Sequence, residues 1–184
     1  MYLIAGLGNP GRRYAQTRHN VGFMLIDRLA RRSDLGFSNL LSAEVARWKE
    51  SGVDVVLAKP QTYMNLSGPA VAALIRFYKV DLADCLVVYD EVALPLGQIR
   101  FRASGSAGGH KGMASVIESL GTEAVPRLRI GIDGEARQRS LTDYVLDRFS
   151  SQEMELLNEV LNRCVRGIES FMEAGIDRAM AAFN

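Results

Sequence analysis

Residues 1–22, MYLIAGLGNPGRRYAQTRHNVG, decide the fold. They open with an apolar run from Tyr2 to Leu7, which predicts a strand buried on both faces. A turn rich in glycine and proline follows, and a polar loop then leads to His19. There an apolar pattern with a period near 3.6 residues predicts a helix over residues 19–32. A buried strand that passes through a loop into a helix is typical of an α/β protein.

The turn contains a GxGxxG pattern at residues 6–11, which matches the fingerprint of dinucleotide-binding proteins. In that class the helix begins inside the glycine motif, so that its N-terminus faces the pyrophosphate. Here Pro10 and Gly11 force a turn, and residues 12–18 separate the motif from the helical pattern. The sequence therefore favours a tight turn that places Asn9. A dinucleotide-dependent oxidoreductase is kept as an alternative.

The rest of the chain alternates predicted strands and helices. Further strands are predicted at 42–50 and 53–58, which form a hairpin around Ser51-Gly52, and at 86–89, 98–102 and 127–132. Further helices are predicted at 66–79, 113–120 and 151–182, the last capped by Ser150 or Ser151 and interrupted near Gly175. Residues 133–139 are predicted to be a polar loop, followed by a short helical or irregular piece. We expect residues 1–184 to fold as a single α/β domain, with a mixed, mostly parallel twisted sheet and helices on both faces.

The composition is that of an ordinary globular protein, with 48% hydrophobic and 23% charged residues. No apolar run approaches the ~20 residues that span a bilayer, and no secretory signal pattern precedes the first strand, so we expect a cytoplasmic protein. The chain has two cysteines, Cys85 and Cys164, and two histidines. Both cysteines fit core positions better than a disulfide, and so few ligands argue against a structural zinc site.

Charge is unevenly spread although the net charge is only +1. Residues 1–49 contain eight Lys or Arg and three Asp or Glu, whereas residues 141–184 contain four and eight. A basic N-terminal segment would suit an anionic partner, but charged helix faces in contact with solvent explain the pattern equally well. The excess is too small to indicate tight DNA binding.

Polar side chains follow several predicted strands, and in open α/β sheets the carboxyl ends of the strands form the ligand site. Asn9 and His19 follow the first strand. Asn65 and Asp90 follow the strands that end at residues 58 and 89. A histidine can act as a general base near neutral pH, and a carboxylate on its other ring nitrogen fixes its tautomer. Because no serine is placed as a nucleophile, the sequence predicts that His19, oriented by Asp90, activates water.

Each of these residues also has a purely structural explanation. Asn9 and Asn65 are typical turn or helix-cap residues, and Asp90 is placed equally well to cap a turn or a helix. The segment ASGSAGGHKG at residues 103–112 has the glycines of a phosphate-binding loop, with Lys111 nearby. It lacks the Lys-Ser/Thr ending of an NTPase P-loop, and a flexible wall beside the site is the alternative.

Taken together, these motifs resemble the bacterial-type peptidyl-tRNA hydrolase family. The resemblance rests on GLGNPGRRYAQTRHNVG at 6–22, KPQTYMNLSG at 59–68, VVYDEVALPLGQIRFRASGSAGGHKG at 87–112 and PRLRIGID at 126–133. It covers nearly the whole chain, and its TRHN and MNLSG blocks are the most specific parts. It implies a cytoplasmic α/β monomer without metal or organic cofactor. Such an enzyme hydrolyses the ester between a peptide and the 3′ ribose of tRNA.

The resemblance also implies roles for individual positions. His19 matches the general base, Asp90 the carboxylate that orients it, and Asn9 a residue that helps to distinguish blocked from free aminoacyl-tRNA. The positions implied to contact the tRNA or the peptide are Tyr14, Tyr63, Met64, Asn65, His110 and Lys111. Lys111 departs from the asparagine that is usual in the family, and its ammonium could meet a phosphate near the 3′ end.

Basic side chains are the natural candidates for the face that binds tRNA. The sequence offers Arg100, Arg102, Lys111, Arg127 and Arg129. Contacts of this kind make binding salt-dependent and largely independent of nucleotide sequence, which suits an enzyme that accepts every tRNA. A non-catalytic RNA-binding relative with the same fold is the second alternative.

Overall fold

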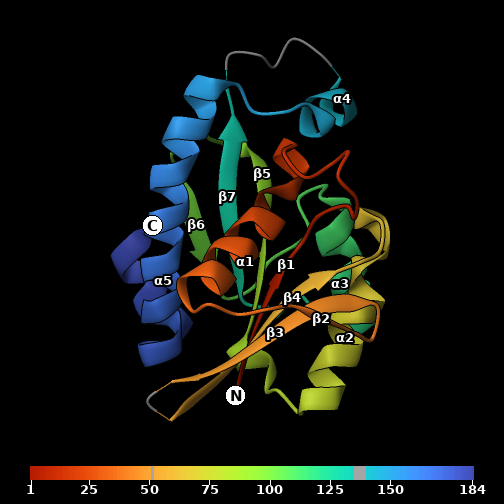
Figure 1. The fold of residues 1–184 in the computed structure, drawn as a ribbon, viewed down its shortest axis with the longest axis vertical. Helices are drawn as coiled ribbons and strands as arrows, with labels where there is room; N and C mark the ends of the chain where they lie inside the picture. Colours follow the sequence, from red (N-terminus) through yellow and green to blue (C-terminus); the bar gives the residue numbers. More distant parts are fainter. Residues whose placement is uncertain (51, 135–139) are drawn as a thin grey trace.

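The computed structural model describes residues 1–50, 52–134 and 140–184 (Figure 1). Its strands are β1 (Tyr2–Gly6), β2 (Ser38–Leu40), β3 (Ala43–Glu50), β4 (Val53–Pro60), β5 (Cys85–Pro95), β6 (Ile99–Arg102) and β7 (Arg127–Asp133). Its α-helices are α1 (Val21–Arg32), α2 (Ser67–Tyr78), α3 (Lys111–Leu120), α4 (Leu141–Leu146) and α5 (Ser151–Phe183). Short 3-10 helices are η1 (Arg18–Asn20), η2 (Met64–Leu66) and η3 (Leu82–Asp84).

The strands of the described residues form one seven-stranded sheet in the order β2-β3-β4-β1-β5-β7-β6. The central strands β4, β1, β5 and β7 are parallel to one another. Antiparallel pairs extend the sheet at both edges, with β2 and β3 beyond β4, and β6 beyond β7. Only β3 and β6 therefore run against the common direction, and the predicted mixed α/β sheet is confirmed.

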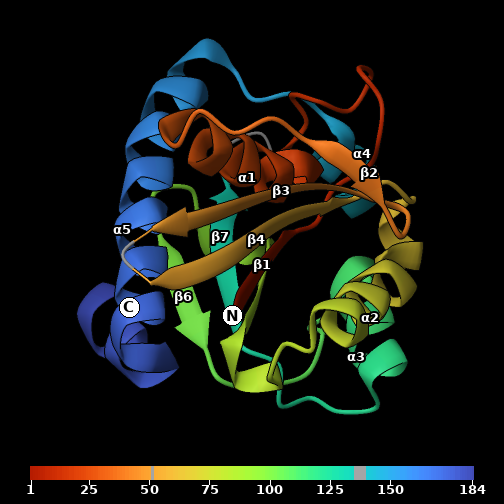
Figure 2. The ribbon, with the colours of Figure 1, turned by 60° about the horizontal axis from the view of Figure 1, so that its bottom comes forward.

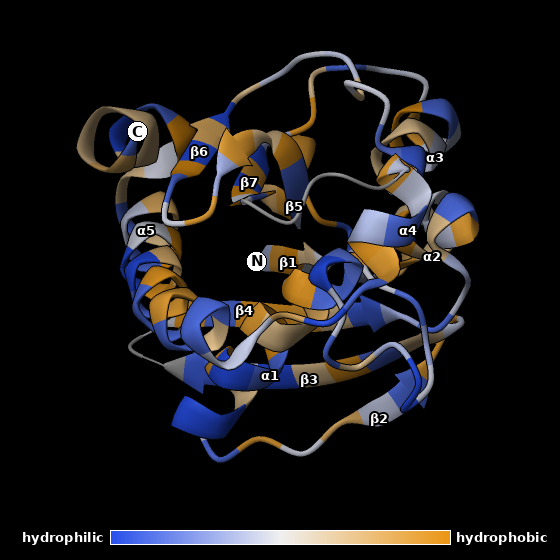
Figure 3. Cartoon of the chain, turned by 90° about the horizontal axis from the view of Figure 1, so that it is seen from above, coloured by the Kyte–Doolittle hydropathy of each residue, from blue (hydrophilic) through white to orange (hydrophobic). Residues whose placement is uncertain are grey.

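Helices cover both faces of this sheet because side chains alternate along the buried strands. On β1, Ile4 joins a core cluster with α1 and α5, whereas Leu3 and Ala5 join a cluster with α2 and α3. Figure 2 shows α2 and α3 side by side on the far side of the sheet from α5. Figure 3 shows β1 as a hydrophobic strand in the middle of the molecule.

The carboxyl ends of three central strands meet at one edge of the sheet. Ala5 of β1 is in register with Ala58 of β4, and Gly6 with Val88 of β5. The segments that leave these ends therefore start side by side. This edge is where the side chains singled out from the sequence converge.

Helix α1 rests directly on the end of the sheet because two glycines allow it. A Cβ atom on Gly22 would lie 2.5 Å from the Leu7 carbonyl oxygen and 2.6 Å from that of Val88. A Cβ atom on Gly6 would lie 2.4 Å from the carbonyl oxygen of Gly22. The backbones of α1 and β1 thus touch, and this contact sets the position of η1, which immediately precedes α1.

Several predicted boundaries change in the structure. Strand β5 continues past residue 89 to Pro95 because Val87 to Glu91 pair with β7, so Asp90 lies inside the strand and not after it. Residues 38–40, for which no strand was predicted, form β2, and α3 begins at Lys111 instead of residue 113. The Ser150 cap and the break at Gly175 are confirmed. The turn at Ser51 and residues 135–139 of the predicted loop lie outside the described residues.

Replacing Gly22 by alanine should destabilise the fold by about 1–3 kcal/mol, because the added methyl group overlaps backbone atoms that cannot rotate away. The measurement is the free energy of unfolding in denaturant. Gly36→Ala is the matched control, since nothing lies within 4 Å of a Cβ atom there. Equal effects of the two substitutions would contradict the seating of α1 on the strand ends.

Candidate active site

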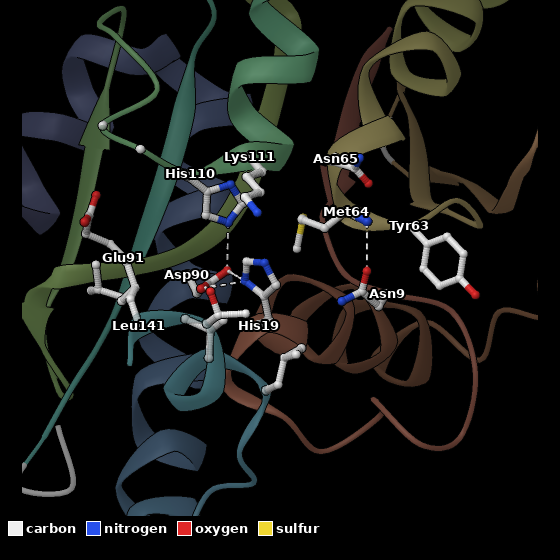
Figure 4. Close-up of a pocket in the computed structure, with 16 residues that line it drawn as sticks. Asn9, His19, Tyr63, Met64, Asn65, Asp90, Glu91, His110, Lys111 and Leu141 are labelled. Carbon is white, nitrogen blue, oxygen red and sulfur yellow. Dashed lines mark hydrogen bonds and ion pairs between the residues drawn. The ribbon is translucent and has the colours of Figure 1, made fainter. Parts of the chain in front are cut away.

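Two imidazoles meet one buried carboxylate at the carboxyl edge of the sheet (Figure 4). His19 comes from η1, Asp90 from β5, and His110 directly precedes α3. The Nδ1 atom of His19 lies 2.9 Å from both carboxylate oxygens, and Nε2 of His110 lies 2.9 Å from Oδ1. The Asp90 side chain is only 1% exposed. The structure thus brings together the predicted His19–Asp90 pair and adds His110 to it.

Asp90 is held in its ionised form. Burial by itself would raise the pKa of this carboxyl, but the facing His110 and His19, which hydrogen-bond to it, outweigh burial and hold the pKa well below its usual range. An ionised carboxylate only accepts hydrogen bonds, so His19 must present Nδ1–H to it. The Nε2 atom of His19 then keeps a lone pair, and no other described residue hydrogen-bonds to it.

Asn9 is fixed by three hydrogen bonds in the loop after β1. Its Oδ1 accepts from the backbone N–H of Met64 at 2.8 Å. Its backbone N–H donates to Oδ1 of Asn20 at 2.9 Å, and its carbonyl accepts from Nδ2 of Asn20 at 2.8 Å. Because Met64 occupies the amide oxygen, the Nδ2 donors of Asn9 are the part left for a ligand. Asn20 locks the Asn9 loop to η1, a role that the sequence did not reveal.

A pocket of about 350 Å³ opens over these groups. Eight of the predicted residues line it: Asn9, His19, Tyr63, Met64, Asn65, Asp90, His110 and Lys111. Tyr63 and Asn65 are exposed at its rim, and Lys111 is exposed at the start of α3. Tyr14 is not among the lining residues, and its ring lies beneath the Arg13 guanidinium, 5.4 Å away. The substrate contact implied for Tyr14 would therefore lie outside this pocket, and it stays a prediction.

Helix α4 supplies an apolar wall that the sequence did not predict as part of the site. The wall consists of Leu141, Val145 and Leu146. Six residues are too short for a periodic signal, and only the Ser140 cap, which accepts from Asp143 N–H, could have indicated the helix. Arg18, the residue before His19, connects this helix to the catalytic loop through hydrogen bonds. The Arg18 backbone N–H donates to the Asp147 carbonyl, and its guanidinium pairs with Glu153 at 2.9 Å.

The structure corrects the prediction that Arg127 belongs to the face that binds tRNA. It is only 1% exposed, and its guanidinium donates to the backbone carbonyls of Val125, Ser106 and Glu123 at 2.8–3.0 Å. These bonds satisfy a buried cation and tie the 103–110 segment to β7, so Arg127 cannot face tRNA. Arg127 and Arg129 point to the same face of β7, so the alternation of side chains along the strand could not have distinguished them.

Arg129 is partly exposed and pairs with Glu91, which also lines the pocket. Its Nε atom donates to Oε2 of Glu91 at 2.8 Å, while Oε1 of Glu91 accepts from the backbone N–H of Ala93. Arg100 and Arg102 lie on the neighbouring strand β6, and both are partly exposed. These three arginines, unlike Arg127, are positioned at the surface of the sheet edge.

The ligand atoms of His19, Asp90 and His110 lie within 4.8 Å of one another, which is also a spacing found in metal sites. The hydrogen bonds explain the cluster differently. The Nδ1 atom of His110 accepts from the Met113 backbone N–H at 3.1 Å, so Nε2 carries the proton and has no lone pair for a metal. That the enzyme needs no metal or other cofactor stays a prediction.

The fold and the site define an α/β enzyme with an imidazole–carboxylate pair beneath a pocket, an arrangement suited to hydrolysis. Comparison with known proteins gives the family. The family model described as "Peptidyl-tRNA hydrolase" matches residues 3–184. The chain belongs to the peptidyl-tRNA hydrolase family and is a hydrolase.

Individual relatives agree with this assignment along the whole chain. Peptidyl-tRNA hydrolase of Chloroflexus aggregans is 50% identical, with 100% of this chain and 99% of the relative covered. The enzyme of Carboxydothermus hydrogenoformans is 47% identical, with 100% and 98% covered. The crystal structure of peptidyl-tRNA hydrolase from Acinetobacter baumannii superimposes with a TM-score of 0.91 at 32% identity, covering 100% of this chain and 96% of that one.

Two further expectations can be compared with the structure. Within the described residues, none of the helices is both long and apolar enough to span a membrane. Cys85 and Cys164 are both buried, and burial raises the pKa of the Cys85 thiol to about 12. The two cysteines are therefore core residues, as the sequence predicted.

Replacing Asp90 by asparagine should lower the free energy of unfolding by about 1–3 kcal/mol at neutral pH, since the two imidazoles lose their charged acceptor. The folded-state pKa of Asp90 lies below its unfolded value. Its contribution to stability is thus present above the unfolded pKa of about 3.9 and disappears as pH falls through the lower, folded value.

Denaturation of wild type and Asp90→Asn between neutral and acidic pH measures this difference. It should be largest at neutral pH and shrink in acid. Asp54→Asn, which removes a surface ion pair with Arg47, is the control and should have a smaller effect. A difference for Asp90→Asn that does not change with pH would contradict an ionised Asp90.

Proposed function

We propose that this enzyme hydrolyses the ester bond between a peptide and the 3′ ribose of tRNA, with His19 as general base. The single observation that carries the mechanism is the contact of His19 Nδ1 with the ionised Asp90, which leaves Nε2 free beside the pocket. Membership of the peptidyl-tRNA hydrolase family supplies the substrate class.

In the proposed reaction, Nε2 of His19 takes a proton from water as the water oxygen bonds to the ester carbonyl carbon. Asp90 stabilises the resulting imidazolium through Nδ1–H, as the carboxylate does in a Ser-His-Asp triad. The bond between the carbonyl carbon and the ribose 3′ oxygen then breaks, and His19 returns the proton to that oxygen. The products are free tRNA and a peptide with a new carboxyl group.

Asn9 and Asn65 are proposed to hold the peptide carbonyl. Because Asn9 Oδ1 already accepts from Met64, its Nδ2 donors are free for the carbonyl oxygen, where negative charge develops. Asn65 lines the same pocket from η2 and is exposed. Tyr63, with an exposed ring on the rim, is suited to stack on a base or a peptide side chain.

The tRNA is proposed to lie across the pocket mouth, with its phosphates facing Arg100, Arg102, Arg129 and Lys111. Such contacts are independent of nucleotide sequence. The enzyme is expected to act as a monomer in the cytoplasm, where translation takes place.

Two alternatives from other classes are less well supported. A non-catalytic RNA-binding relative would not need the His19–Asp90 contact or the oriented amide of Asn9. A dinucleotide-dependent oxidoreductase would need the glycine turn to face a ligand, whereas Gly6 and Gly8 face Gly22 and Phe23 of α1. Hydrolysis of N-acyl-aminoacyl-tRNA decides the first alternative, and titration with NAD(H) decides the second.

His19→Ala should lower kcat by at least about 10²–10⁴-fold, the usual contribution of a general base, while tRNA affinity changes little. The measurement is release of N-acetyl-aminoacyl groups from tRNA, with tRNA binding and thermal unfolding measured on the same variant. A variant that is folded, binds tRNA and keeps wild-type turnover would rule out His19 as the base.

Lys111→Asn should raise KM and reduce the slope of log affinity against log salt by about 1, the value for one lost phosphate contact. Lys79→Asn is the matched control, because Lys79 is an exposed lysine at the end of α2 that does not line the pocket. Its left-handed backbone, with φ 53°, also tolerates asparagine. If both variants behave alike, Lys111 lies outside the contact surface.

A further inference from the structure

His110 caps α3 with a ring nitrogen. It occupies the N-cap position, where serine, threonine, aspartate or asparagine is usual, and its Nδ1 accepts from the backbone N–H of Met113 at 3.1 Å. A backbone N–H can only donate, so Nδ1 of His110 must be the unprotonated nitrogen. The ring is therefore locked as the tautomer with its proton on Nε2.

The locked proton points to Asp90. Nε2 of His110 lies 2.9 Å from Oδ1 of Asp90, the same oxygen that His19 Nδ1 approaches at 2.9 Å. One carboxylate thus accepts from two imidazoles of opposite tautomer, Nδ1–H in His19 and Nε2–H in His110. Protonation of His110 would break the α3 cap and place a cation at the positive end of the helix dipole.

Two rings, one carboxylate and little solvent surround His110. The Tyr89 ring of β5 lies 4.6 Å away and the His19 ring of η1 lies 5.1 Å away, measured between ring centroids. Asp90 is the acidic group that faces it, and Lys111, the neighbouring residue of α3, is the closest cation in sequence. The His110 side chain is only 9% exposed, which leaves little of it for contact with a substrate.

We infer that His110 is a positioning residue for the hydrolytic reaction. It is a neutral donor in a fixed tautomer that holds the Asp90 carboxylate against His19 and accepts part of the carboxylate's negative charge through the hydrogen bond. This inference rests on the proposed general-base role of His19. It replaces the substrate-contacting role implied for His110 by the sequence resemblance.

The bond from His110 has two consequences for His19. It restrains rotation of the carboxylate, so that both of its oxygens stay 2.9 Å from His19 Nδ1. The same hydrogen bond attracts part of the carboxylate's negative charge toward His110, so less of that charge faces His19. Without it the carboxylate would stabilise the His19 imidazolium more strongly.

The first test reads the tautomers directly in the resting enzyme by ¹⁵N–¹H NMR of the imidazoles. The chain has two histidines, so His110→Asn assigns the signals. We expect His110 in the resting enzyme to be neutral with its proton on Nε2, and neutral His19 to carry its proton on Nδ1. A His110 that carries its proton on Nδ1, or protons on both ring nitrogens at neutral pH, overturns the inference. A neutral His19 protonated on Nε2 overturns the general-base proposal instead.

The second test compares His110→Asn with His110→Ala. Asparagine is a good N-cap, so it keeps the bond from Met113 but is too short to donate to Asp90, whereas alanine loses both bonds. Both variants should move the acid limb of the kcat/KM profile upward by about 0.5–1 pH unit and lower kcat, with KM nearly unchanged. The alanine variant should lose more thermal stability than the asparagine variant, because it also loses the helix cap.

The outcomes separate the possible roles. A raised KM with an unmoved acid limb in His110→Asn would make His110 a substrate contact and overturn the inference. Wild-type kinetics in His110→Asn together with destabilised His110→Ala would reduce His110 to a helix cap and overturn it as well.

Discussion

The site depends on burying one carboxylate at the end of a parallel sheet. A carboxylate out of water must be hydrogen-bonded or it becomes protonated. The chain meets this requirement for Asp90 with two imidazoles that come from opposite sides, His19 before α1 and His110 before α3. The helices that carry them cover opposite faces of the sheet, so the same carboxylate that orients the base also joins the two layers at their active edge.

The sequence predicts the convergence of Asn9, His19 and Asp90, because all three lie at or beyond the level where the central strand β1 ends. It does not predict how these groups are oriented, since orientation depends on backbone N–H groups whose directions appear only in three dimensions. Arg127 illustrates the same limit: its charge suggests a surface role, but three backbone carbonyls converge on its buried guanidinium. At α4 the sequence predicts only a short helical or irregular piece, because six residues carry too little periodicity to show which face is apolar.

The GxGxxG pattern has a physical explanation that involves no nucleotide. Added Cβ atoms on Gly6 and Gly8 would meet the Gly22 carbonyl and the Phe23 ring of α1, at 2.4 and 2.7 Å. Gly11 has φ +103°, which a turn requires, and open space around it. The first two glycines thus let α1 lie against β1, and the third turns the chain away from the helix. Because α1 therefore starts only at Val21, the loop between β1 and α1 is long enough to place His19 beside Asp90.

Asn9 and His110 are oriented by one shared device. Both side chains are ambiguous, since an amide has an oxygen and a nitrogen end and a neutral imidazole has two tautomers. In each case a backbone N–H donates to the acceptor atom of the side chain: Met64 N–H to Oδ1 of Asn9, and Met113 N–H to Nδ1 of His110. The donor of each side chain is thereby committed, toward the pocket for Asn9 and toward Asp90 for His110. Both N–H groups lie at the starts of helical segments, η2 and α3. The packing of those segments therefore fixes which side-chain atoms of the site donate and which accept, before any substrate binds.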